Sequence, residues 1–238
     1  MKNSIPVRLL TAEDYYSVFS PEYAERSDKE TEAKRKAIET RLRQIHEVLY
    51  PQIKPLGYAC HYRKQNITTS SSPDMYNQFS VRWIGVKYVK GFSEANKDLL
   101  PFQKMASLQF GINEKGFFAG LHFAVAEDAY DRQRLSQNNY RLFSRVRPRI
   151  EAELQKLTGE GYTWEMSGAS ESYEFPIRED TVSGFCDWFR EHDRDGLHSG
   201  LHQYQEENLI LQSPAVIAGE IRRVMVKLHP LYSAMTCR

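Results

Sequence analysis

The sequence predicts an α+β fold with a mainly antiparallel sheet of about five to seven strands and amphipathic helices packed on it. The strongest observation is an alternating apolar run that turns back on itself at residues 113–116. This pattern is typical of a tight β-hairpin between residues 105–112 and 117–125. The second observation is that further strand patterns alternate with separate helical patterns, which favours α+β architecture over parallel βαβ units.

Length and composition are those of a globular chain. The chain has 238 residues, of which 41% are hydrophobic and 26% charged. We expect a single domain over residues 1–238, with a lobe boundary near residues 193–205 as the alternative organisation. The formal net charge of +1 argues against steering of the whole protein toward nucleic acid or lipid, so any anion site has to be a local patch.

The sequence contains none of the patterns that indicate export or a membrane, and this sets our expectation of its cellular location. The three cysteines have no paired spacing that would indicate a zinc knuckle or a redox pair. The first residues have no apolar run like that of a signal peptide. No window approaches the roughly 18 apolar residues of a membrane span. We therefore expect a reduced, cytoplasmic protein without a membrane partner.

Three amphipathic helices are predicted, at residues 31–49, 128–157 and 214–228. Apolar residues recur at helical spacing in each of them. Pro51 and Pro55 should end the first helix, and Pro230 should end the third. Pro148 lies inside the second pattern, where it should kink the helix or restart it. A shorter helix should follow Asp180.

The remaining pattern predicts strands and loops. Besides the hairpin, strands are expected at residues 58–64, 78–89, 162–166, 172–177 and 208–212. Residues 66–74 and 192–205 are rich in polar residues and are predicted to be loops.

The second helical segment carries a row of arginines. At about 100° per residue they fall within an arc of roughly 80°. Guanidinium groups bind phosphate oxygens in pairs, so this row could contact a nucleic acid or another phosphorylated ligand. The alternative is a solvated face whose charge is neutralised by carboxylates of residues 160–180. The row consists of Arg134, Arg141, Arg145 and Arg149.

Two aromatic residues of the predicted strand 78–89 are candidate stacking groups. Trp83 and Tyr88 lie among basic residues, an arrangement that can stack a base and hold its phosphate. The same alternation is also what a half-buried strand needs for packing alone.

A cluster of histidines and an aspartate marks a candidate metal site. Neutral imidazoles and carboxylates are ligands of divalent metals, so the cluster supports a metal-dependent hydrolase or nuclease as an alternative function. The glycines within the segment argue against the helix that would bring the two later histidines together, and an exposed loop is the competing interpretation. The cluster consists of His192, Asp195, His198 and His202.

One further histidine, His122, lies in the predicted hairpin. It alternates with Leu121 and Phe123 and should therefore face the opposite side of the strand. We interpret it as a satisfied sheet residue rather than a general base.

The hairpin also resembles the central hairpin of the YktB-like family of bacterial proteins of unknown function. The resemblance is carried by Leu108-Gln109-Phe110-Gly111-Ile112 and by Phe117-Phe118-Ala119-Gly120-Leu121-His122-Phe123. The resemblance covers residues 10–155 and implies a bacterial protein with a compact α+β fold. It implies no catalytic residues, because the family has no established activity.

These observations favour a non-enzymatic binding module for nucleic acid or another phosphorylated ligand, acting through the arginine-rich helix and needing no cofactor. The metal-dependent hydrolase, with a divalent metal as cofactor, is one alternative. A protein-interaction or inhibitor module with exposed tyrosines at its interface is the other. The sequence leaves open whether the protein is an enzyme.

Overall fold

The computed structural model describes residues 11–24, 28–60, 67–72, 75–85, 106–123, 140–168, 171–194 and 197–236. In these residues one antiparallel sheet has the strand order β1-β3-β4-β5-β8-β6-β7, and β2 also pairs with β3. The predicted α+β class and antiparallel sheet are confirmed. The strands are β1 Tyr58–Cys60, β2 Ile67–Ser72, β3 Met75–Gly85, β4 Ser107–Asn113, β5 Gly116–Phe123, β6 Tyr162–Ser167, β7 Ser172–Pro176 and β8 His198–Tyr204.

The sheet is seven strands wide although it contains eight. β4 pairs with one edge of β3. β1 and β2 both pair with the other edge, β1 near Gly85 and β2 nearer the start of the strand. They therefore share one position in the sheet.

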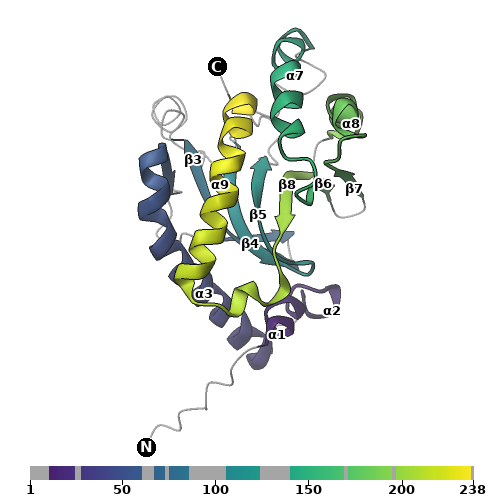
Figure 1. Cartoon of the computed structure of the whole chain (residues 1–238). Coiled ribbons are helices and arrows are strands. Elements are labelled where there is room, and N and C mark those ends of the chain that lie inside the picture. Colours follow the sequence, from purple (N-terminus) through teal and green to yellow (C-terminus); the bar gives the residue numbers. More distant parts are fainter. Residues whose placement is uncertain are drawn as a thin grey trace, which may run out of the picture.

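Helices lie across one face of this sheet, where α3 and α9 pack against each other and α7 lies beside α9 (Figure 1). The α-helices are α1 Ala12–Ser17, α2 Pro21–Ala24, α3 Lys29–Ile53, α7 Tyr140–Gln155, α8 Phe185–His192 and α9 Pro214–Thr236. Short 3₁₀ turns occupy Lys54–Leu56, Val182–Gly184 and Glu207–Leu211. Among the described residues, no helix is both long enough and apolar enough to span a membrane.

The start of α3 and the course of α9 show how these helices are fixed. Asp28 caps α3 by accepting hydrogen bonds from the backbone N–H groups of Glu30 and Thr31. α9 continues through Pro230 to Thr236, so the predicted end at Pro230 is wrong. The extension buries Leu231 and other side chains, which offsets the hydrogen bond lost at the proline.

The hairpin is confirmed as β4 and β5. The Asn113 side chain accepts hydrogen bonds from the backbone N–H groups of Lys115 and Gly116, which closes the turn. Gly116 has φ +134°, a region that favours glycine.

Three predicted segments are wrong. Residues 67–72 form β2 rather than a loop, and residues 207–211 form a 3₁₀ turn rather than a strand. Residues 198–204, predicted as a loop, form the interior strand β8, which pairs with β5 and β6. β8 therefore joins β5 on one side of the sheet to β6 on the other.

The two faces of the sheet differ in chemistry. Successive strand residues point to opposite sides, and one side is apolar and covered by α3, α8 and α9. The central apolar residues of this side are Val81, Trp83, Leu108, Phe110, Ile112, Ala119, Leu121, Phe123, Trp164 and Leu201. Each large buried side chain contributes about 2 kcal/mol of gross stabilisation. This layer fixes the register that orients the opposite side.

Candidate binding site on the polar face of the sheet

The side of the sheet opposite the helices carries polar residues, and we call it the polar face. Strand alternation places its side chains between those of the apolar layer. Several of them are fully buried, including Ser80, Ser107 and Gln109. Its central residues are Ser80, Arg82, Ser107, Gln109, Gly120, His122, Glu165, His198, Gly200, His202 and Tyr204.

Two glycines give the polar face a floor without side chains. In the register, Gln109 of β4 lies opposite Gly120 of β5, and Gly120 lies opposite His202 of β8. A Cβ atom on Gly120 would lie 3.1 Å from the imidazole Cδ2 of His202, and one on Gly200 would lie 3.0 Å from its Nε2. The imidazole therefore lies over the two glycines, in space that any larger residue would fill.

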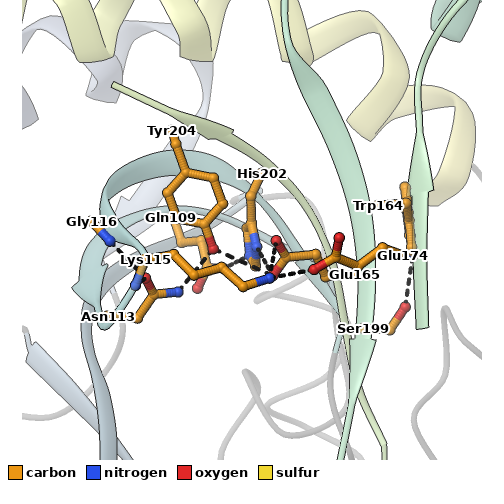
Figure 2. A network of polar contacts seen from close by, with 10 residues as sticks. All are labelled: Gln109, Asn113, Lys115, Gly116, Trp164, Glu165, Glu174, Ser199, His202 and Tyr204. Carbon is orange, nitrogen blue, oxygen red and sulfur yellow. Dashed lines mark hydrogen bonds and ion pairs between the residues drawn. The ribbon is translucent and has the colours of Figure 1, made fainter. Parts of the chain in front are cut away.

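Because Gly120 has no side chain, residues two strands apart can meet. Gln109 Nε2 lies 3.1 Å from His202 Nε2, although β4 and β8 are separated by β5, a span of roughly 9.5 Å between backbones. Figure 2 shows the two side chains reaching toward each other.

The other nitrogen of the imidazole faces a carboxylate. His202 Nδ1 lies 3.1 Å from Glu165 Oε2, and both side chains are nearly buried. An ionised carboxylate only accepts hydrogen bonds, so Nδ1 carries a proton and donates a hydrogen bond to Glu165. A neutral imidazole then has its lone pair on Nε2, where it accepts from the amide group of Gln109.

Glu165 is the centre of a wider network (Figure 2). Its carboxylate also binds Lys115 Nζ at 3.1 Å and accepts a hydrogen bond from the Tyr204 hydroxyl at 3.3 Å. Lys115 in turn pairs with Glu174. Burial by itself raises the pKa of Glu165, but His202 and Lys115 lower it to about 2. Glu165 is therefore ionised at neutral pH.

Two polar atoms beside this network have no hydrogen-bond partner among the residues that the structure describes. They are Ser107 Oγ and Gln109 Oε1, and both residues have 0% exposed surface. They lie on the same side of β4, two residues apart. A buried unsatisfied polar group costs about 1–3 kcal/mol, so this pair is the feature of the polar face that most needs an explanation.

A cation lies next to the two atoms in the sheet. Arg82 of β3 is opposite Gln109 in the register, and its Nε donates to Ser80 Oγ at 3.3 Å. Burial lowers the pKa of Arg82 to about 10, so the guanidinium keeps its charge at neutral pH. The polar face thus has a positive group at the β3 side and carboxylates at the β6 and β7 side.

The stacking role predicted for Trp83 is wrong. Its side chain belongs to the apolar layer, has 0% exposed surface, and packs between His46 and Phe110 with ring centroids 5.9 Å and 5.2 Å away. A base could stack on it only after the core had opened. Tyr88, the other predicted stacking residue, lies outside the described residues.

Only part of the predicted arginine row lies in the residues that the structure describes. Arg134 lies outside the described residues, and Arg141 lies in α7. Arg145 and Arg149 are exposed on α7. Four carboxylates of the acidic stretch 160–180, which the alternative interpretation gave as partners of the row, form these ion pairs: Glu160 with Lys227, Glu165 and Glu174 with Lys115, and Glu171 with Arg194.

The predicted metal site is not assembled in the described part of the chain, where no group of three His, Cys, Asp or Glu side chains could hold a metal ion. His192 lies on α8, and its Nδ1 lies 2.9 Å from the Trp188 carbonyl oxygen. His198 and His202 lie on β8 rather than in a loop, and they share a face because four residues are two full periods of a strand. Asp195 lies outside the described residues.

Sequence reasoning missed Ser107, Gln109 and Glu165. The available signal was polar residues at alternate positions of strands that are otherwise apolar, together with a glycine on the facing strand. His122 faces away from Leu121 and Phe123, as predicted, and is buried on the polar face.

Comparison of the chain with protein-family models, curated proteins and solved structures gives no match. The resemblance to the YktB-like family therefore stays a prediction, and the site has to be interpreted from its own geometry.

Proposed function

We propose that this protein binds a small polar ligand on the polar face of the sheet, and that Ser107 and Gln109 contact it. The observation that carries the proposal is the pair of fully buried polar atoms, Ser107 Oγ and Gln109 Oε1, without partners among the described residues. A ligand hydrogen-bonded to both atoms would remove the cost of leaving them unsatisfied.

The surroundings of the pair fit a specific site rather than a packing defect. The Gln109 amide is hydrogen-bonded to His202, and His202 is hydrogen-bonded to Glu165. These two contacts fix the position of the amide. Gly120 and Gly200 leave the space that this arrangement needs. Fixed polar groups of this kind are what orient a ligand in a binding site.

The proposal is tested by comparing two serine variants. Ser107→Ala removes an unsatisfied hydroxyl, so the free energy of unfolding should stay the same or rise by about 1 kcal/mol. Ser80→Ala is the matched control, because Ser80 is equally buried but accepts a hydrogen bond from Arg82. That variant should lose about 1 kcal/mol.

The binding experiment screens small hydroxylated, amine-bearing and acidic compounds by thermal shift against both variants and the unmodified protein. We expect compounds that raise the melting temperature of the unmodified protein and of Ser80→Ala but not of Ser107→Ala. Compounds that stabilise all three proteins equally would place the binding elsewhere and contradict the proposal.

A second candidate function is binding of nucleic acid by α7. The observation that favours it is that Arg145 and Arg149 are exposed one helical turn apart. Arg147, two residues from each, pairs with Glu151 and Asp187. Exposed guanidinium groups on one side of a helix can contact successive phosphates.

A salt titration tests this second function. Binding of DNA or RNA at low salt should weaken as salt rises, and replacing Arg145 and Arg149 by Gln should reduce the slope. Arg43→Gln, an exposed arginine on α3, is the matched control. An absence of binding at low salt, or equal slopes for all variants, would rule this function out.

A further inference from the structure

The last strand of the sheet has an open edge. β7 pairs with β6 on one side, and on its other side it pairs with no strand that the structure describes. Figure 1 shows β7 at the margin of the molecule. Ser172 and Glu174 of this strand are exposed to solvent. An open edge of this kind is a template on which another strand can pair.

The pairing with β6 decides which backbone groups face the open edge. Ile177 N–H donates to the Tyr162 carbonyl oxygen at 2.9 Å, so the backbone groups of Ile177 face β6. This orientation alternates along an antiparallel ladder, and the N–H and C=O groups of Ser172 and Glu174 therefore point outward. Pro176 is the next outward position, and because it has no N–H, the row of outward donors ends there.

We propose that this edge pairs with the same edge of a second copy of the protein, so that the two sheets join into one. The pairing places Ser172 opposite Glu174 of the other copy, and Glu174 opposite Ser172 of the other copy. Each of these two pairs forms two backbone hydrogen bonds, which satisfies every outward N–H of the strand. Such a contact is isologous, because both copies contribute the same surface.

The side chains select this register over its neighbour within β7. If one strand slides by two residues, Glu174 lies directly opposite Glu174 of the other copy, and like charges in that position destabilise a sheet. In the proposed register the Ser172 hydroxyl is instead opposite that carboxylate, to which it can donate a hydrogen bond.

The charges near the edge fit a second copy better than a basic partner. Glu174 already pairs with Lys115. Glu171, next to the start of β7, pairs with Arg194. Both carboxylates thus have a cation from their own chain, so two copies can approach without unpaired acidic charges facing each other.

Half-buried rings on the α8 side of the edge give the contact an apolar part. Tyr173 of β7 packs against His192 of α8 with ring centroids 4.7 Å apart, and Phe175 packs against Trp188 at 5.1 Å. All four rings are only partly buried. In the proposed register Tyr173 lies opposite Tyr173 of the other copy, and aromatic pairs across strands stabilise a sheet.

Sedimentation velocity of the full chain over a range of concentrations tests the inference. The contact is short compared with an interface of standard size, so we expect a weak dimer with a dissociation constant of roughly 10–300 µM. The inference does not rest on the functions proposed above, since it uses neither Ser107 and Gln109 nor α7.

A proline variant separates edge pairing from any other contact. Ser172→Pro removes the outward N–H but keeps the hydrogen bonds with β6, and Pro176 shows that the strand accepts proline at such a position. The dimer loses two backbone hydrogen bonds, so its dissociation constant should rise at least tenfold. Ser172→Thr is the matched control. It keeps the N–H and the hydroxyl, and it should dimerise as well as the unmodified protein.

Cysteine variants test the register. Tyr173→Cys places the two cysteines directly opposite each other, where Cα atoms lie about 4.5 Å apart, within the range of a disulfide. Mild oxidation should therefore give a covalent dimer. Glu171→Cys is the control, because Glu171 lies opposite Phe175 of the other copy. It should cross-link no faster than the unmodified protein, which has three cysteines of its own.

Two results would overturn the inference. One is a protein that stays monomeric up to about 1 mM, or that dimerises equally well as Ser172→Pro and as Ser172→Thr. The other is equal cross-linking of Tyr173→Cys and Glu171→Cys. A melting temperature of Ser172→Pro close to that of the unmodified protein shows that the variant is folded. If it is not folded, the comparison of the two cysteine variants decides.

Discussion

The close approach of β5 and β8 predicts that Gly200 tolerates no side chain. A Cβ atom at this position would lie 2.7 Å from the carbonyl oxygen of Leu121 and 3.0 Å from His202 Nε2. Gly200 does not have a positive φ angle, so its backbone conformation suits any residue and the conflict is one of space alone. Gly200→Ala must push β5 and β8 apart or displace the imidazole.

We expect Gly200→Ala to lower the free energy of unfolding by about 2 kcal/mol. Overpacking of a buried position costs roughly 1–3 kcal/mol, and the reduced freedom of the unfolded chain returns less than about 1 kcal/mol of that. For a chain of this size the melting temperature should fall by about 4–8 °C.

A second glycine provides the matched control. Gly219 lies inside α9, and a Cβ atom there would meet nothing within 4 Å. Gly219→Ala should raise the free energy of unfolding by about 1 kcal/mol, because alanine favours the helix. Urea unfolding of both variants measures the difference. A Gly200→Ala variant as stable as the unmodified protein would refute the spacing of β5 and β8, and with it the floor on which His202 lies.

Three further predictions concern buried titratable groups. Glu165→Gln should cost about 3 kcal/mol at pH 7. The pKa of Glu165 is held at about 2, below its ordinary value of 4.5, so the loss should be constant above pH 4.5 and vanish as the pH falls toward 2 in urea unfolding. Burial lowers the pKa of His46 to about 4, so the unfolded chain binds the extra proton. Stability should fall as the pH drops from 6.5 to 4, and His46→Phe should reduce this slope to the part that carboxylates such as Glu165 contribute near pH 4. Burial raises the pKa of Cys186 to about 12, and peptide mapping should find it unmodified by a thiol reagent until the protein unfolds.

Much of the fold was predictable because its segments follow simple periods. The hairpin of β4 and β5 and the buried stripe of α3 are strong local patterns that tertiary contacts only reinforce. The errors arose where polar residues form strands. β2 is made of threonines and serines after its first residue, and β8 combines histidines with Gly200, so composition alone indicated loops.

The candidate site could be predicted only in part, for a physical reason. His198 and His202 were expected to share a face only in a helix, and the glycines beside them favoured a loop, although a spacing of four also places them on one face of a strand. The partners of His202 come from β4 and β6, far away in sequence. Which strands become neighbours depends on the global pairing of the sheet, and no local period contains that information.

Buried polar atoms without partners lower the stability of the folded protein. Their presence on the polar face therefore argues that they bind a ligand. A sheet that packs helices on one side needs apolar residues there, and it needs none of the buried polar atoms found on the other side. His202 and Glu165 satisfy each other, so they could be retained for structure alone. Ser107 Oγ and Gln109 Oε1 have no such justification within the described chain. Alanine at position 107 would fill nearly the same space without the penalty, so a protein without a ligand for these atoms would gain stability by losing the hydroxyl.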